Sequence, residues 1–444
     1  MESVEIKRLL REKKYSLLKD ELLNEQVVDI AEFIDKLDIK ADVILVFRLL
    51  PKEIAAEVFP YLSSESQSEI SMLVDEKELA EILDDLYFDD KIDFLEEMPA
   101  SVVNRILQNA SESERKLINQ FLNYPDDSAG SIMTIEFVHF KKEMTVQEAL
   151  DKIRSIAPGK ETIYTCYVSD AYRRLEGIVS LRDLVLYPPT DTIADIMRTD
   201  IISIDTLDDK EYTADLIKKY NLLAIPVTDH EKRLVGIITV DDIIDVMEDE
   251  TTEDFHKMAT VGEINTSLLD ASPWLLLRRR IPWLLILVFV NIFSGAGIAH
   301  FQETIESVIA LVFFLPLLID SAGNAGSQSA TLMIRALAVG DVRIEDWFQL
   351  IKKEFLVAIP LGLFMALAVS LVGFFRAGID VAVVVALSMV VIVVVGSTVG
   401  MSLPFVLNRF NKDPATASGP LVTSIADIAG VLIYFSIARW YLGI

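Results

Sequence analysis

Long apolar segments dominate the second half of this chain. Each is close to the twenty residues that a helix needs to cross the hydrocarbon core of a bilayer. They span residues 281–299, 307–334, 355–375, 381–408 and 420–438. Inside them, Asp320 and Asp427 are the charged residues. The pattern predicts an α-helical membrane protein with cytosolic domains, in which a five-helix transmembrane bundle occupies residues 273–444.

Basic residues between the apolar segments indicate how this bundle is oriented. Five crossings place the two chain ends on opposite sides of the membrane. Arg376 and Arg439 fall on the side of the C-terminus, whereas nine basic residues flank the segments on the other side. Because cytoplasmic loops are enriched in Lys and Arg, we expect the front half in the cytoplasm. We expect the bundle in the cell (inner) membrane, with the C-terminus on its outer side.

Asp427 is the ionisable residue of the last apolar segment. An ionised side chain at that depth costs on the order of 3 kcal/mol or more, so it is expected to face a bundle interior or a watery path. A bound cation would compensate it. The alternative is a carboxylate that only packs helices together, hydrogen-bonded to Thr423 and Ser424 or held protonated.

Polar residues also recur at helical spacing in two of the segments. In the second segment, the residues that share a face are Asp320, Asn324, Ser327 or Gln328, and Thr331. In the last segment, a similar face holds Thr423, Asp427, Gly430 and Tyr434. Such faces are typical of a cavity lining, although small and hydroxyl residues also serve close helix packing. Close packing is what we expect from the small residues at 396–402.

The front half divides into a helical part and a repeat. Residues 1–128 show apolar positions at helical spacing, interrupted by prolines, and predict an all-α superhelical domain of short stacked helices. Residues 129–250 repeat internally, because Leu175–Leu184 matches Leu234–Ile243 at a shift of 59. Each repeat predicts a helix, two short strands and a helix. This is the pattern of tandem CBS domains, which pair into an α/β disc.

An acidic connector joins the repeat to the membrane segments. Asp245, Asp249 and Glu253 stand at i, i+4 and i+8, where like charges on one helix face repel unless a cation intervenes. We expect a helix from Asp241 to Leu269 and assign residues 251–272 to it as a connecting, or plug, helix. Such a helix would couple the front half to the bundle.

Charge divides the chain as sharply as hydropathy does. Residues 1–270 hold 58 of the 68 acidic and 30 of the 41 basic residues, a net charge of −28, against +1 for the remainder. This balance excludes nucleic acid as a partner and favours metal cations or a basic partner. The four histidines are scattered, and Cys166 is the single cysteine, so zinc-site spacing is absent. The sequence shows no acid–base or nucleophile constellation, and we do not expect an enzyme.

The order of these parts resembles the MgtE family of magnesium channels across essentially the whole chain. The residues that carry the resemblance are Tyr124–Gly130 before the CBS pair, the acidic connector, Gly323–Ser329, Asp413–Ala415 and Asp427. The resemblance implies a homodimer in the lipid bilayer whose pore lies between two membrane domains. It implies that Asp427 selects the ion and that Asp413 lies near the cytoplasmic mouth.

The family resemblance also implies that cytosolic Mg²⁺ regulates the channel, serving as both substrate and regulator. In the front half it would bridge acidic surfaces and close the pore. The matching positions here are Asp89, Asp93, Asp209, Glu211, Asp242, Asp245, Glu250, Glu253 and Asp254. Along the pore, the candidates are Asp427, Asp413, Asn324, Thr423 and Asp320.

Two alternatives remain open at this point. Carboxylate and water ligands suit several hard divalent ions, so a transporter of cobalt or manganese fits the same residues. A membrane-anchored nucleotide sensor is the alternative from another class, with ATP bound at the CBS pair. An anchor, however, needs neither the buried Asp427 nor a polar face.

Overall fold

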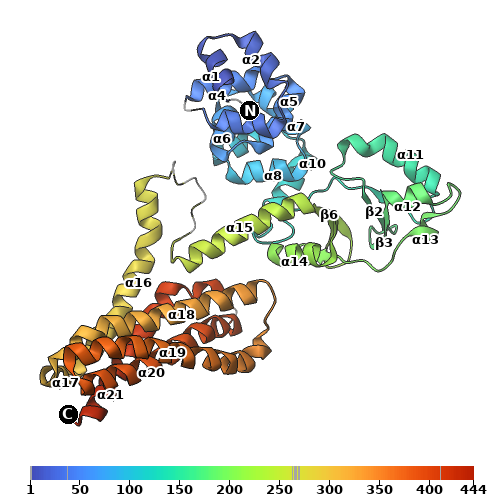
Figure 1. The fold of residues 1–444 in the computed structure, drawn as a ribbon. Coiled ribbons are helices and arrows are strands. Elements are labelled where there is room, and N and C mark those ends of the chain that lie inside the picture. The colour runs from blue at the N-terminus through green and yellow to red at the C-terminus, as the bar shows by residue number, and fades with distance from the viewer. Residues whose placement is uncertain (1–2, 38, 263, 265–267, 269–270, 411) are drawn as a thin grey trace. The chain divides into compact units, whose positions relative to one another are not determined.

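The computed structural model describes residues 3–37, 39–262, 264, 268, 271–410 and 412–444. The described chain forms two compact units, Met1–Glu248 and Asp249–Ile444. We call them the front unit and the membrane unit and describe each by itself (Figure 1).

Short helices build the first part of the front unit, as expected. They are α1 (Ser3–Arg11), α2 (Tyr15–Leu22), α3 (Val27–Asp35), α4 (Lys40–Leu49), α5 (Lys52–Val58), η1 (Phe59–Tyr61), α6 (Ser64–Leu73), α7 (Glu76–Asp85), α8 (Phe88–Glu97), α9 (Ala100–Asn109) and α10 (Glu112–Phe121). Ser63, Asp75 and Ser111 cap three of them by accepting hydrogen bonds from backbone N–H groups of the first turn.

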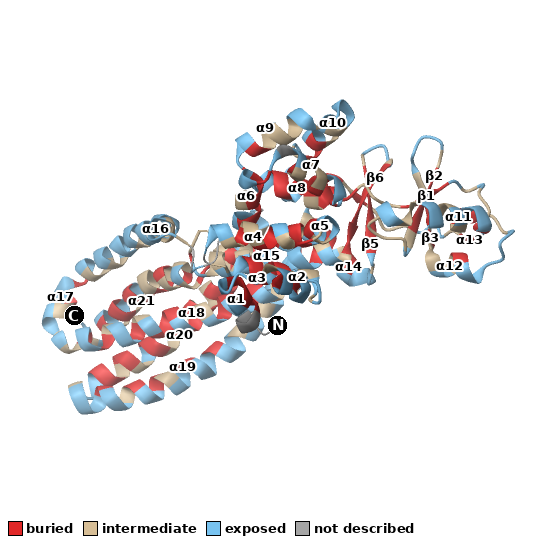
Figure 2. Cartoon of the chain, turned by 90° about the horizontal axis from the view of Figure 1, so that it is seen from above, coloured by how far each residue is buried: buried red, intermediate tan, exposed pale blue. Residues whose placement is uncertain are grey.

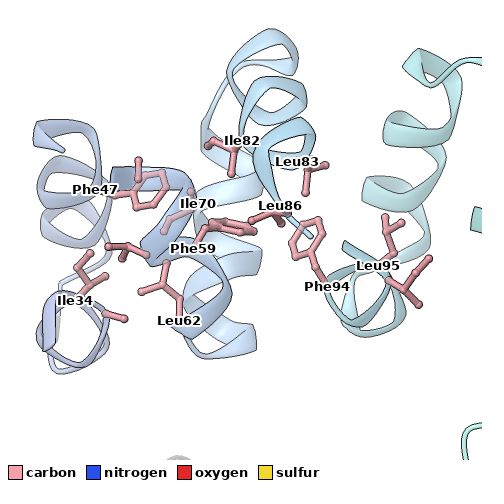
Figure 3. Packing of buried hydrophobic residues seen from close by; sticks show 14 of the residues in the cluster. Ile34, Phe47, Phe59, Leu62, Ile70, Ile82, Leu83, Leu86, Phe94 and Leu95 are labelled. Atoms are coloured by element: carbon pink, nitrogen blue, oxygen red, sulfur yellow. The ribbon is translucent and has the colours of Figure 1, made fainter. Parts of the chain in front are cut away.

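Apolar faces of these helices meet in one core. Phe59 contacts Phe47 and Phe94 edge to face, with ring centroids 6.1 and 5.2 Å apart (Figure 3). Edge-to-face pairs stabilise a core beyond the area they bury. This core fixes the position of α8, the helix that carries Asp89 and Asp93.

The repeat forms two three-stranded sheets of equal topology. The first contains β1 (His139–Phe140), β2 (Thr165–Ser169) and β3 (Leu175–Ser180); the second contains β4 (Ile204–Asp205), β5 (Ala224–Thr228) and β6 (Leu234–Thr239). In each sheet the first pairing is parallel and the second antiparallel. Because β3 and β6 begin 59 residues apart, the sequence repeat is confirmed. The sequence did not reveal the two-residue strands β1 and β4.

Helices flank these sheets and carry recurring caps. They are α11 (Val146–Ile156), η2 (Ala157–Gly159), α12 (Leu181–Leu186), α13 (Ile193–Ile196) and α14 (Lys210–Tyr220). Ser180 and Asp183 form a capping box at the start of α12. At the equivalent place in the second repeat, the Asp242 carboxylate accepts hydrogen bonds from the hydroxyl and the N–H of Thr239.

The connecting helix is shorter than expected. Helix α15 spans Val240–Met258, so the prediction of a helix to Leu269 was wrong. Thr260 adopts a left-handed conformation with φ of 56°, and the N–H of Val261 donates to the carbonyl oxygen of His256. This conformation ends the helix. Residues 263, 265–267 and 269–270 of the expected helix lie outside the described residues.

Among its described residues, the membrane unit contains five helices that are long and apolar enough to cross a bilayer. The unit comprises α16 (Pro273–His300), α17 (Gln302–Ser307), η3 (Ile309–Phe314), α18 (Leu315–Ala338), η4 (Ile344–Asp346), α19 (Trp347–Ala377), α20 (Ile379–Arg409), η5 (Pro414–Thr416) and α21 (Gly419–Leu442). The second segment departs from its expected form, because its α-helix begins at Leu315 rather than near Ser307. Pro316 lacks a backbone N–H and is favoured in the first turn of a helix, which places the start there.

Small residues bring α18 and α20 into close contact. A Cβ atom on Gly400 would lie 1.9 Å from the carbonyl oxygen of Gly326, and one on Gly396 would lie 2.5 Å from that of Ala322. The close packing expected for residues 396–402 is therefore confirmed. Figure 2 shows buried residues along α18, α20 and α21, whereas the residues of α16 are exposed or intermediate.

Candidate cation sites

The polar face of α18 divides into an exposed part and a packed part. Asp320, Asn324, Gln328 and Thr331 are exposed in the single chain, and Asn324 donates a hydrogen bond to Asp320 (3.3 Å). Ser327 instead faces α21, where its hydroxyl lies 3.2 Å from that of Thr423 and donates to the carbonyl oxygen of Gly419. Ser327 therefore serves helix packing, and cavity lining by the exposed residues stays a prediction.

Asp427 is half-buried on α21 and lacks hydrogen bonds in the described part of the chain. Its Oδ1 atom is buried and has no hydrogen-bond partner there. The hydrogen bonds to Thr423 and Ser424, one of the two forms considered for a packing role, are not found among the described residues. Asp320 lies near enough for its charge to act on Asp427. Asp320 lies in the second turn of α18 and Asp427 in the third turn of α21, so both carboxylates lie within membrane helices.

Thr423 and Tyr434 have different surroundings, although they were expected on one polar face. Thr423 packs directly on Gly323, where a Cβ atom would lie 2.7 Å from the Thr423 methyl group. Tyr434 is fully buried and donates its hydroxyl to the carbonyl oxygen of Leu311 (2.9 Å). The prediction that Tyr434 extends the polar face was therefore wrong, because a buried tyrosine hydroxyl finds its partner inside the fold.

Three carboxylates from distant segments gather in the front unit. Asp89 lies in the first turn of α8, and Glu136 and Glu161 lie in loops before β1 and β2. One oxygen of each lies within 4.8 Å of the others. Glu136 is held in place because its Oε2 accepts hydrogen bonds from the N–H of Phe88 (2.9 Å) and the hydroxyl of Thr134 (3.1 Å). We call Asp89, Glu136 and Glu161, with the neighbouring Asp242, the acidic cluster.

Burial and mutual repulsion make ionisation of this cluster costly. Asp89 is 8% exposed, and its Oδ1 atom is buried without a hydrogen-bond partner among the described residues, as is Oε2 of Glu161. Burial, followed by the charges of Asp242 and Glu161, raises the pKa of Asp89 to about 9. Burial and the charge of Asp242 raise the pKa of Glu161 to about 7. Burial likewise raises the pKa of Asp242.

Such a cluster is chemically suited to a hard cation. A like-charged, buried group of carboxylates either retains protons or binds a positive ion. Oxygen ligands from carboxylates are those that Mg²⁺ and Ca²⁺ prefer. Cys166 is buried in another core, and histidine does not contribute to the cluster, so the described donors do not favour zinc.

The other predicted regulatory residues of the front unit are not among the three gathered carboxylates. Asp93 is exposed one turn further along α8, and Asp245 is exposed on α15. Asp209 caps α14 by accepting hydrogen bonds from the N–H groups of Glu211 and Tyr212. The structure gives Asp209 a structural role that the sequence pattern did not indicate.

A second acidic group lies in the membrane unit at the end of α15. The Lys257 ammonium is 2.6 Å from a carboxylate oxygen of Glu253 and 2.6 Å from one of Asp413. Asp413 also accepts a hydrogen bond from the N–H of Ala415 (2.8 Å). Burial, followed by the charge of Asp413, raises the pKa of Asp254. Burial lowers the pKa of Lys257, but its hydrogen bonds to Asp413 and Glu253 outweigh this and raise it.

Several residues of these sites were missed at the level of sequence. Glu136 and Glu161 sit in irregular segments, where no periodicity marks them. Lys257 follows Glu253 at i+4 and resembles an ordinary surface ion pair. Glu354 was also missed. Its carboxylate accepts a hydrogen bond from the hydroxyl of Ser329 on α18 (2.6 Å).

A cavity lined by residues of both repeats contains basic side chains. It measures about 260 Å³ and is lined by Ser180, Arg182, Asp183, Tyr187, Ile196 and Arg198. Its two arginines could contact the phosphates of a ligand.

Comparison with known families agrees with the order of the parts. Residues 315–437 match the MgtE family model, described as a divalent cation transporter, and residues 25–127 match the MgtE intracellular N domain. Residues 129–189 and 193–249 each match the CBS domain.

Relatives extend the likeness over most of the chain. The magnesium transporter MgtE of Thermus thermophilus is 39% identical over 401 residues, 89% of this chain and 88% of the relative. The Bacillus subtilis protein of the same name is 34% identical over 95% of this chain and 96% of its own length. A solved cytosolic domain of the Mg²⁺ channel MgtE in complex with ATP is 37% identical, with a TM-score of 0.52, and covers 55% of this chain and 99% of that one.

Proposed function

This chain belongs to the MgtE family, and from that premise we propose that it conducts Mg²⁺ across a membrane along α18 and α21. The observation that carries the proposal is Asp427, a half-buried membrane carboxylate with a buried oxygen that lacks a partner in the described chain. A bound cation would compensate the charge of such a group. Mg²⁺ sheds its waters reluctantly and is usually held by one or two carboxylates with waters retained.

The exposed face of α18 supports a homodimeric pore. Asp320, Asn324 and Gln328 face outward from the single chain at membrane depth, where uncovered polar groups are unfavourable. A second copy placed against this face would enclose a polar path. Two Asp427 carboxylates would then offer two negative charges to one dication. By the basic-residue bias, the front unit is cytoplasmic and the C-terminus lies outside.

Cytosolic Mg²⁺ also regulates the proposed channel. The acidic cluster joins α8, two loops of the repeat and the start of α15, so an ion bound there would draw these segments together. Asp93 and Asp245 lie on the same two helices and are proposed to assist. Glu250, Glu253 and Asp254, with Asp413, form the proposed second regulatory group. Asp209 and Glu211 remain ligands predicted from the family resemblance.

Flux of Mg²⁺ into liposomes tests the transport function. Asp427→Ala is expected to abolish flux, and Asp427→Asn to be nearly as damaging because it retains shape but loses charge. Asp380→Asn is the matched control, since this exposed carboxylate stands at the outer start of α20. Flux at the wild-type rate through the alanine variant would contradict the pore assignment. Flux of Co²⁺ and of Mn²⁺, measured in parallel assays, determines which ion the protein prefers.

Nucleotide binding is a second candidate function of the front unit. The cavity with Arg182 and Arg198 supports it, and the related cytosolic domain was solved with ATP. Arg182→Ala is expected to weaken ATP binding by about tenfold or more, because a charge-assisted contact is worth roughly 1.5–3 kcal/mol. Calorimetry with ATP measures this, and unchanged affinity would exclude the cavity.

A further inference from the structure

Lys257 occupies the place between two carboxylates that a bridging cation would take. Its ammonium is 2.6 Å from Glu253 and 2.6 Å from Asp413, and all three residues belong to the membrane unit. The three side chains are about one-third exposed. The two carboxylates come from α15 and from the segment before η5, far apart in sequence, so the lysine joins two elements of the fold.

Local structure holds this arrangement in place. The adjacent Met258 packs against a small core of Ile334, Ala415 and Ala417, which anchors the last turn of α15 on the membrane unit. Asp413 is oriented by its hydrogen bond from the N–H of Ala415 (2.8 Å) and starts the turn of η5. Glu253 lies one helical turn before Lys257. Asp413 is therefore held by a backbone N–H, whereas Glu253 is held by its ion pair with Lys257.

We propose that Lys257 is a resident counter-ion, which a divalent cation must displace in order to bridge Glu253 and Asp413. This rests on the proposed function, and it adds a residue that sets the cation concentration at which this group responds. A dication and an ammonium repel each other at contact distance. The lysine therefore lowers the affinity of these carboxylates for Mg²⁺ and keeps them compensated when Mg²⁺ is scarce.

A purely structural lysine would have the opposite consequence. If Lys257 only ties α15 to the membrane unit, its removal loosens that contact and raises the Mg²⁺ concentration needed for closure. If Lys257 competes with the cation, its removal leaves Glu253 and Asp413 facing each other, and closure needs less Mg²⁺. The direction of the shift thus separates the two roles.

The test uses the full chain with Lys257→Met and Lys257→Arg. In liposome flux, Lys257→Met is expected to lower the half-closing Mg²⁺ concentration by about three- to tenfold, as expected from removing a neighbouring charge at an exposed site. Lys257→Arg retains the charge and is expected to remain near wild type. A shift of Lys257→Met to higher Mg²⁺, or no shift, would overturn the proposal.

A binding measurement keeps this test separate from gating. Cys166 is buried, so a nitroxide placed on Thr252→Cys, an exposed position beside Glu253, reports locally on bound Mn²⁺. Lys257→Met is expected to show Mn²⁺ broadening of the label at about three- to tenfold lower concentration, and adding Asp413→Asn should cancel the gain. Equal or weaker Mn²⁺ binding by Lys257→Met overturns the inference. This readout holds even if wild-type flux proves insensitive to Mg²⁺, which would contradict only the proposed regulation.

Discussion

The two acidic groups of this molecule differ in how their charge is compensated. In the front unit, Asp89, Glu136 and Glu161 approach one another with buried oxygens that lack partners in the described chain. In the membrane unit, Glu253 and Asp413 share the ammonium of Lys257. The first group is destabilised until protons or a cation arrive, whereas the second is already neutralised in part. The lysine in the second group therefore predicts that the two groups differ in their sensitivity to Mg²⁺.

This difference has a physical meaning for regulation. A cation that binds an uncompensated cluster relieves repulsion and stabilises the segments it joins. One that binds the compensated group must first displace an ion pair. We expect the acidic cluster to bind Mg²⁺ at lower concentration than the group around Lys257, so that closure proceeds in order as Mg²⁺ rises.

The largest expected effect comes from neutralising the acidic cluster itself. Wild-type protein should gain about 2.7 kcal/mol of local stability at Mg²⁺ one hundred times above the dissociation constant. Hydrogen exchange of the α8 amides in the full chain measures this gain. Asp89→Asn with Glu161→Gln should abolish it, and without Mg²⁺ the double substitution should slow exchange near pH 9, where the wild-type carboxylates ionise and repel one another.

Asp84→Asn provides the matched control for that experiment. Asp84 is an exposed carboxylate on α7, outside the three gathered carboxylates. It removes one acidic charge from the same helical domain, so the Mg²⁺ effect should survive. If the double variant still gained protection from Mg²⁺ as the control does, the cluster would not be the binding site.

The next largest expected effect is the dependence of the stability of α8 on pH. Asp89, with a pKa of about 9, and Glu161, with one of about 7, retain protons in the folded state that the unfolded chain releases near pH 4. Their contribution to stability is complete below pH 4 and is lost as pH rises through the folded pKa values. Without Mg²⁺, the α8 opening free energy should fall by up to about 1.4 kcal/mol per pH unit for each group.

Saturating Mg²⁺ should flatten this pH profile, because the ion replaces the protons that the cluster otherwise retains. Exchange rates measured between pH 5 and 9, corrected for intrinsic exchange, give the comparison. A profile that is equally steep with and without Mg²⁺ would show that the ion does not bind these carboxylates.

The smallest expected effect is that of substituting Asp209. Two substitutions at this position distinguish a capping role from cation binding. Asp209→Asn preserves the cap of α14 but removes a charge, so Mg²⁺ sensitivity should change little. Asp209→Ala should destabilise α14 locally by about 1 kcal/mol. Hydrogen exchange of the α14 amides measures the local stability and its response to Mg²⁺. A large change in this response in Asp209→Asn would show that Asp209 is a Mg²⁺ ligand.

Much of the architecture followed from periodicity in the sequence. The five membrane helices, the stacked front helices and the doubled sheet all have strong repeating patterns, and the structure contains each of them. The end of α15 was missed because the chain turns at Thr260, where no glycine or proline marks the left-handed conformation. The start of α18 was misplaced because the apolar run already begins in η3, which precedes this helix, and continues into α18 without interruption.

The sites were less accessible to such reasoning. Asp427 stands out because it is charged in an apolar segment, and Asp89 and Asp242 came from the family resemblance. Glu136 and Glu161 depend on the path of two loops, which is determined by tertiary packing. The pairing of Lys257 with Asp413 joins residues more than 150 positions apart. Contacts of this kind leave no local pattern.

Flux through reconstituted protein, measured against Mg²⁺ on the side of the front unit, tests the central claim most directly. Wild-type flux should fall steeply as this Mg²⁺ rises, and Asp89→Asn with Glu161→Gln should shift the fall to higher concentration while leaving the maximal flux intact. Asp427→Ala should pass no Mg²⁺ at any concentration. Wild-type flux that does not respond to Mg²⁺, or a double variant that closes as the wild type does, would contradict the account.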